Sequence, residues 1–134
     1  MSPVLVDSNV ILDVVTDDPA WREWSADQLA VCADTAMLVV NPIVYAEVSI
    51  GFERIEEVEE AMPGDFFRRE ALPWEAGFLA GKCFLRYRRS GGQRQALLPD
   101  FYLGAHAAVR GYRLLTRDPR RFRSYFPTLE ILAP

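Results

Sequence analysis

Four carboxylates fall near the ends of predicted strands, at Asp7, Glu47, Asp100 and Asp118. Asp7 directly follows the apolar run Val4–Val6, and Asp118 follows Leu114–Leu115 after two further residues. The other two lie in the first turns of predicted helices, Glu47 in the helix that begins at Pro42 and Asp100 in the helix that begins at Pro99. In a parallel α/β sheet these positions gather at the carboxyl edge, where such folds bind their ligands.

Considered one at a time, these residues have ordinary structural explanations. Asp7 and Asp118 are typical helix caps, and Asp100 would interact favourably with the dipole of its helix. Glu47 is harder to explain in this way, because its neighbours one turn along the predicted helix are apolar and burying an unpaired carboxylate is costly. A salt bridge to an arginine and a bound cation are the two alternatives for Glu47.

Considered together, four carboxylates at one edge would repel one another unless a cation neutralised them. Oxygen ligands without His or Cys select Mg²⁺, with Mn²⁺ as the alternative. Such a site suits phosphodiester hydrolysis, because the metal lowers the pKa of a bound water and screens charge on the phosphate. Cys32 and Cys83 are far apart and form no CxxC motif, so we expect small buried side chains rather than zinc ligands or a disulfide.

The elements that must position these residues alternate along the chain. Short runs that are apolar on both faces predict buried parallel strands at Val4–Val6, Met37–Val40, Ala71–Leu72, Leu114–Leu115 and Leu129–Leu132. Proline at the start and glycine after the end predict helices at Val10–Val14, Pro19–Ala33, Pro42–Ile50, Glu53–Ala61, Trp74–Arg89 and Pro99–Gly111, with a short one from Pro119. The Trp74 helix should stop at Gly91-Gly92. We therefore expect one domain over residues 1–134, of the α/β class, as a three-layer α/β/α sandwich around a mainly parallel sheet.

Composition limits the function without identifying it. The net charge of −4 over 134 residues argues against a general nucleic-acid-binding surface. Residues 1–65 hold 14 acidic and two basic residues, whereas residues 66–134 hold five acidic and 13 basic residues, nearly all arginine. Arginine binds phosphate well, although a solvated helix surface explains the same pattern. No apolar run is long enough to span a bilayer and no signal peptide is evident, so we expect a cytoplasmic protein with no membrane attachment.

Several segments of the chain resemble one protein family. They are VLVDSNVILDVV, NPIVYAEVSIGF, LLPDFYLGAHAAVRGYRLLTRDPRRF and YFPTLEILAP, which together span nearly the whole chain. Their order and spacing resemble the PIN-domain family, specifically the VapC-type toxins of toxin–antitoxin pairs. The resemblance implies sheet order 3-2-1-4-5 and Mg²⁺-dependent endoribonuclease activity. It also implies an RNA substrate, a homodimer, and inhibition by a cognate antitoxin.

The resemblance also assigns roles to particular residues. The family's catalytic and metal-binding acidic positions correspond to Asp7, Glu47, Asp100 and Asp118. Asn9 corresponds to a small polar position that supports the first Asp, and Thr116 to a polar site residue at the end of the fourth strand. No acidic position is missing, so we interpret the chain as an active nuclease.

Two other functions are considered. A haloacid-dehalogenase-type phosphatase also carries Asp after its first strand, but it needs a second Asp two residues later, where this chain has Asn9. A PIN-like module that binds RNA or protein without cleavage is the alternative left open. For the antitoxin, the spacing of Ile55, Val58 and Met62 indicates an apolar stripe that either lines a docking groove or packs on the core.

Overall fold

A parallel sheet lies at the centre of the molecule. The computed structural model describes residues 1–91 and 98–134, and in that part of the chain the sheet has five strands in the order β3-β2-β1-β4-β5. The strands are β1 (Val4–Val6), β2 (Leu38–Val40), β3 (Phe67–Arg69), β4 (Arg113–Leu115) and β5 (Ile131–Leu132). Leu5 of β1 lies opposite Val39 of β2 and Leu114 of β4. Because β1 is buried on both faces, its sequence shows no polar alternation.

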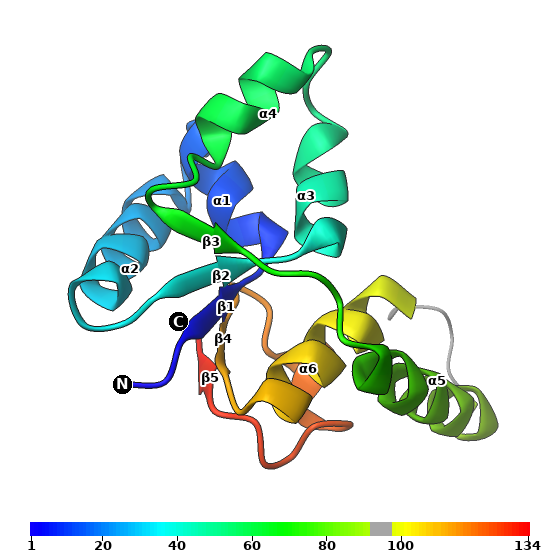
Figure 1. Ribbon diagram of the computed structural model, residues 1–134. Coiled ribbons are helices and arrows are strands. Elements are labelled where there is room, and N and C mark those ends of the chain that lie inside the picture. The colour runs from blue at the N-terminus through cyan, green and yellow to red at the C-terminus, as the bar shows by residue number, and fades with distance from the viewer. Residues whose placement is uncertain (92–97) are drawn as a thin grey trace.

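Helices cover both faces of this sheet. Within the described ranges they are α1 (Ser8–Val15), α2 (Arg22–Thr35), α3 (Pro42–Ser49), α4 (Ile55–Ala61), α5 (Trp74–Arg89), α6 (Leu98–Arg110) and α7 (Arg120–Arg123). Figure 1 shows α1 and α2 on one face and α5 and α6 on the other. Every strand pair is parallel. The predicted α/β/α sandwich and its sheet order 3-2-1-4-5 are confirmed.

Local sequence signals set the ends of several helices. Asn41 caps α3, because its side-chain oxygen accepts a hydrogen bond from the backbone N–H of Val44 at 3.0 Å. Pro42 then provides the first helical residue, so α3 starts directly beyond β2. The predicted α5 matches the observed helix, which is followed by Gly91 at a φ of 79°. Gly92, the second residue of the predicted stop, lies outside the described residues.

Close packing holds α6 against the segment that follows α7. A Cβ added to Gly104 would lie 2.4 Å from a ring carbon of Phe126, so only glycine permits this approach without a shift. Phe101 and Leu103, on the same helix, are buried in the core. This contact fixes the position of α6, which carries Asp100 in its first turn.

One strand prediction was wrong. The third strand is Phe67–Arg69 rather than Ala71–Leu72, which lies in the irregular segment before α5. β3 is an edge strand with two exposed arginines, so a search for continuous apolar runs passes over it. Charged side chains on an edge strand oppose pairing with other chains, which explains why an arginine-rich segment suits this place.

Other expectations can be compared with the same structure. Val58 and Met62 are buried in the core, so the predicted stripe packs inward and only Ile55 is exposed. Cys32 and Cys83 are free and buried, as expected. No helix within residues 1–91 and 98–134 has the length and apolar character needed to cross a membrane.

Candidate active site

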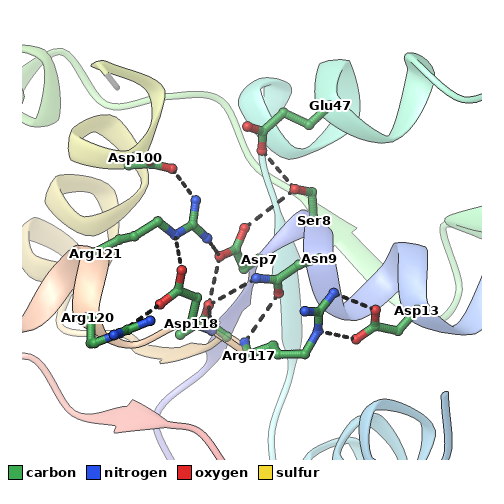
Figure 2. A network of polar contacts seen from close by, with 11 residues as sticks. Asp7, Ser8, Asn9, Asp13, Glu47, Asp100, Arg117, Asp118, Arg120 and Arg121 are labelled. Atoms are coloured by element: carbon green, nitrogen blue, oxygen red, sulfur yellow. Dashed lines mark hydrogen bonds and ion pairs between the residues drawn. The ribbon is translucent and has the colours of Figure 1, made fainter. Parts of the chain in front are cut away.

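Three of the four predicted carboxylates surround one guanidinium group, that of Arg121 in α7 (Figure 2). One terminal nitrogen of Arg121 donates to Asp7 Oδ2 at 2.6 Å, and the other donates to Asp100 Oδ1 at 2.6 Å. The Nε atom lies 3.6 Å from Asp118 Oδ2. These carboxylates follow β1, open α6 and follow β4, so the carboxyl edge of the sheet brings them together as the spacing predicted.

Glu47 joins this group through a serine. Ser8 Oγ donates a 2.9 Å hydrogen bond to Glu47 Oε1 and lies 3.5 Å from Asp7 Oδ1. Figure 2 shows Ser8 placed between the two carboxylates. In the described part of the chain, Glu47 forms no salt bridge with an arginine. The structure therefore places Glu47 close to Asp7, and the charge of Asp100 also acts on it.

Thr116 and Asn9 hold Asp7 in place. Thr116 Oγ1 donates to Asp7 Oδ2 at 2.8 Å, and Asn9 Nδ2 lies 3.4 Å from the same hydroxyl oxygen. The backbone N–H of Asp118 donates to Thr116 Oγ1 at 3.1 Å, which ties the β4–α7 turn to the site. Asp7 is the N-cap residue of α1 but its side chain makes no capping bond, and the N-cap of α7 is Pro119. Helix capping does not explain these two aspartates.

Arg121 does not fully compensate the negative charge of the four carboxylates, and burial and mutual repulsion disfavour the ionised forms of Asp7 and Glu47. Burial raises the pKa of Asp7, and Arg121 and the Thr116 hydrogen bond only partly oppose this effect. Burial also raises the pKa of Glu47, against the Ser8 hydrogen bond, and the charges of Asp7 and Asp100 add to the rise. A carboxylate whose ionised form is disfavoured by burial and by neighbouring charges gains from a further cation.

The donor set fits a small hard cation. All four side chains offer carboxylate oxygens, and a guanidinium already stands among three of them as a cation. Among the described residues, no three Asp, Glu, His or Cys side chains lie close enough together to hold a metal ion directly. Mg²⁺ suits such an open arrangement, because it keeps several waters and uses only one or two carboxylates directly.

Sequence reasoning missed three residues at this edge. It left Arg121 and Arg117 out of the site and did not consider Ser8. The signal for Arg121 was its spacing, three residues after Asp118, since a turn of this length brings the two side chains to within 3.6 Å of each other. Arg117 forms a two-bond ion pair with the buried Asp13, at 2.9 and 2.8 Å.

A buried network fastens α3 to α6, the helices that carry Glu47 and Asp100. His106 is fully buried and lies 2.9 Å from Asn41 Nδ2 through Nδ1 and 2.9 Å from Glu70 Oε1 through Nε2. Asn41 uses its oxygen to cap α3, so its amide nitrogen donates to Nδ1 of His106, and Nε2 of His106 donates to Glu70. Tyr112 also donates to Glu70, at 2.7 Å. His106 is thus a packed histidine of the core.

Comparison with known proteins identifies the family. A family model described as the PIN domain matches residues 4–125. A search of curated proteins finds no match.

Solved structures share the fold along nearly the whole chain. VapBC2 from Rickettsia felis bound to a promoter DNA fragment matches with a TM-score of 0.76 and 15% identity over 98% of both chains. VapBC-1 from nontypeable Haemophilus influenzae matches with a TM-score of 0.74 and 18% identity over 98% of this chain and 97% of that one. A toxin–antitoxin complex from Klebsiella pneumoniae matches with a TM-score of 0.68 and 18% identity over 89% of each chain. At these identities the likeness concerns the fold alone.

Proposed function

Because the chain belongs to the PIN-domain family, we propose that it is a Mg²⁺-dependent endoribonuclease and acts as the toxin of a toxin–antitoxin pair. The observation that carries this proposal is the gathering of four carboxylates from four separate segments at one edge of the sheet, around a position that attracts a cation. The fold shared with VapBC proteins and with a toxin–antitoxin complex supports the toxin role.

In this proposal the chain's own residues position the reacting groups. Asp7, Glu47, Asp100 and Asp118 would hold Mg²⁺, or Mn²⁺ in its place. The bound metal would make an attacking water more acidic and screen the charge of the phosphate. Thr116 fixes the carboxylate of Asp7, and Asn9 steadies the Thr116 hydroxyl. Ser8 keeps Glu47 directed toward the same edge.

The test is cleavage of end-labelled RNA by antitoxin-free protein. We expect internal cleavage that needs Mg²⁺ or Mn²⁺ and stops with a chelator. Asp100→Asn should lower the rate at least about 100-fold, because it weakens a ligand needed for charge stabilisation. Asp27→Asn is the matched control, since Asp27 is exposed on α2, and should cleave like the wild type. RNA that is bound but stays intact under all metal conditions would favour the binding module instead.

A basic segment of the antitoxin is proposed to inhibit the enzyme at the same carboxylates. An acidic, partly buried site attracts arginine or lysine, and Arg121 already demonstrates that a guanidinium fits. Mg²⁺ should therefore weaken the complex more than a monovalent salt at equal ionic strength. Equal weakening by both salts would mean that the antitoxin does not occupy the carboxylates.

The assembly and location are also proposals. We propose a single domain over residues 1–134, a homodimer in solution, and a cytoplasmic location. Light scattering of the purified chain measures the mass directly, and a mass near the chain's 15.2 kDa would refute the dimer.

A further inference from the structure

We propose that Arg121 is a built-in counter-ion of the candidate catalytic carboxylates, that the divalent cation must displace it, and that the displaced guanidinium then contacts an RNA phosphate. The inference rests on the proposed nuclease function and deepens it. It gives a role to a residue that the sequence analysis left outside the site.

The contacts of Arg121 are those of a cation placed among several negative charges. Its two terminal nitrogens bind two different carboxylates, of Asp7 and Asp100, each at 2.6 Å (Figure 2). Its Nε is buried and has no hydrogen-bond partner among the described residues, although Asp118 Oδ2 lies 3.6 Å away. The group therefore neutralises the cluster without satisfying all of its own donors.

The ion pair between Arg117 and Asp13, in the same region, has the geometry of a stable structural salt bridge. Its Nε and one terminal nitrogen both bind the single carboxylate of Asp13, in the parallel two-bond arrangement that suits a guanidinium. Ser25 completes that pair with a 2.7 Å hydrogen bond to Asp13. Arg121 lacks this matched geometry, so its contacts are easier to exchange for another cation.

The guanidinium of Arg121 and a divalent metal ion cannot both bind the carboxylates of Asp7 and Asp100. A metal held by Asp7 and Asp100 needs oxygens that now accept bonds from Arg121, and it would bring two positive groups close together. Arg121 stands on the short helix α7 and its side chain is 25% exposed, so it has a path to solvent. Once released at the rim of the site, the guanidinium is placed to bind a phosphate of the substrate, which its two-pronged shape matches.

The first measurement is Mn²⁺ affinity by calorimetry without RNA, for the wild type, Arg121→Gln and Arg123→Gln. Arg123 is the matched control, because it is an exposed arginine on the same helix and its loss changes the net charge equally. We expect Arg121→Gln to bind Mn²⁺ about tenfold more tightly, since no competing charge-assisted bonds need to break. Arg123→Gln should stay within about twofold of the wild type, because surface charges are largely screened.

The second measurement is RNA affinity with Ca²⁺ in place of Mg²⁺, with a gel to confirm that the RNA is intact. Arg121→Gln should bind RNA about tenfold more weakly although it binds metal more tightly, because a guanidinium–phosphate contact is lost. Arg121→Lys keeps the positive charge, so its Mn²⁺ affinity and its RNA affinity should lie between those of the wild type and of Arg121→Gln. The lysine variant also tests the proposal if Arg121→Gln fails to fold.

Equal Mn²⁺ affinity in the wild type and both Arg121 variants would overturn the inference and leave the nuclease proposal standing. Weaker binding of both metal and RNA by Arg121→Gln would also overturn it and assign Arg121 a structural role. Tighter Mn²⁺ binding by Arg121→Gln in a protein that cleaves no RNA would refute the nuclease and keep the displacement. If no protein binds Mn²⁺, both proposals fail.

Discussion

Asp7 and Asp13 are buried aspartates that are each 2% exposed and each bound by an arginine, yet we expect the change to asparagine to affect them differently. At Asp7, burial raises the pKa, so the negative charge opposes folding at neutral pH. Asparagine removes that charge, and its amide oxygen can still accept from Thr116 or Arg121. Replacing a charge-assisted hydrogen bond by a neutral one costs roughly 1 kcal/mol, and relief of desolvation and repulsion offsets it, so the net change should lie within about 1 kcal/mol of zero.

Asp13→Asn is expected to destabilise the protein by about 2–3 kcal/mol. Asp13 accepts two bonds from Arg117, at 2.9 and 2.8 Å, and one from Ser25 at 2.7 Å. An amide replaces one accepting oxygen with a donor that faces a guanidinium. Breaking a fully buried pair costs about 3–5 kcal/mol. The figure is discounted here because the Arg117 side chain is 30% exposed and can reach water.

Thermal melting without metal, followed by RNA cleavage below the melting temperature, separates the two variants. At this chain length about 1 kcal/mol corresponds to roughly 3–5 °C, so Asp13→Asn should lower Tm by roughly 6–15 °C and Asp7→Asn by less than about 5 °C. Cleavage should fall at least about 100-fold in Asp7→Asn and stay within a few-fold in Asp13→Asn. A melting loss for Asp7→Asn equal to that of Asp13→Asn would assign Asp7 a structural role, and retained cleavage would remove it from the mechanism.

Three further outcomes are expected. The raised pKa values of Asp7 and Glu47 contribute stability that is fully present below their ordinary values of 3.8 and 4.5. This stability is lost as the pH rises through the raised pKa values. In metal-free protein, Glu47→Gln should therefore make Tm fall less steeply with increasing pH. An unchanged slope would contradict this reasoning. Gly104→Ala would bring a Cβ against the ring of Phe126 and should lower the free energy of unfolding in urea by about 1–3 kcal/mol. Gly81→Ala has open space around it and should raise the free energy of unfolding by about 0.4–1 kcal/mol. His106→Ala should cost about 2–4 kcal/mol in the same assay, because it removes a buried ring, leaves Asn41 Nδ2 without its partner and takes one hydrogen bond from Glu70. A loss below about 1 kcal/mol would refute the network's role.

The sheet was predictable where strands are buried on both faces. β1 and β4 lie at its centre, and their continuous apolar or buried residues distinguish them from helices and loops. β3 escaped this criterion because Arg68 and Arg69 follow its one buried residue, Phe67. An edge strand is stabilised by pairing with its neighbour, a contact that its own residue types do not reveal.

The gathering of the acidic residues was predictable for a topological reason, whereas the arginine among them was not. Parallel strands bring their carboxyl ends to one edge, so the positions of Asp7 and Asp118 in the chain already indicate that they are neighbours. Arg121 is one of many arginines in the second half of the chain, and its contact with Asp7 depends on the direction of the four-residue helix α7. Their shared catalytic role stays a prediction.

The candidate site is made almost entirely of contacts between distant parts of the chain, which bears on when it forms during synthesis. Thr116 and Asp7 are 109 residues apart, and Arg121 and Asp7 are 114 residues apart. A ribosome produces β1 first, but β1 gains its β4 neighbour only after more than 100 residues have followed. Contacts of this kind form late and slowly in folding. A growing chain therefore lacks the complete candidate site until Asp118 and the residues of α7 have been made, so the proposed activity is expected only once nearly the whole chain has been synthesised.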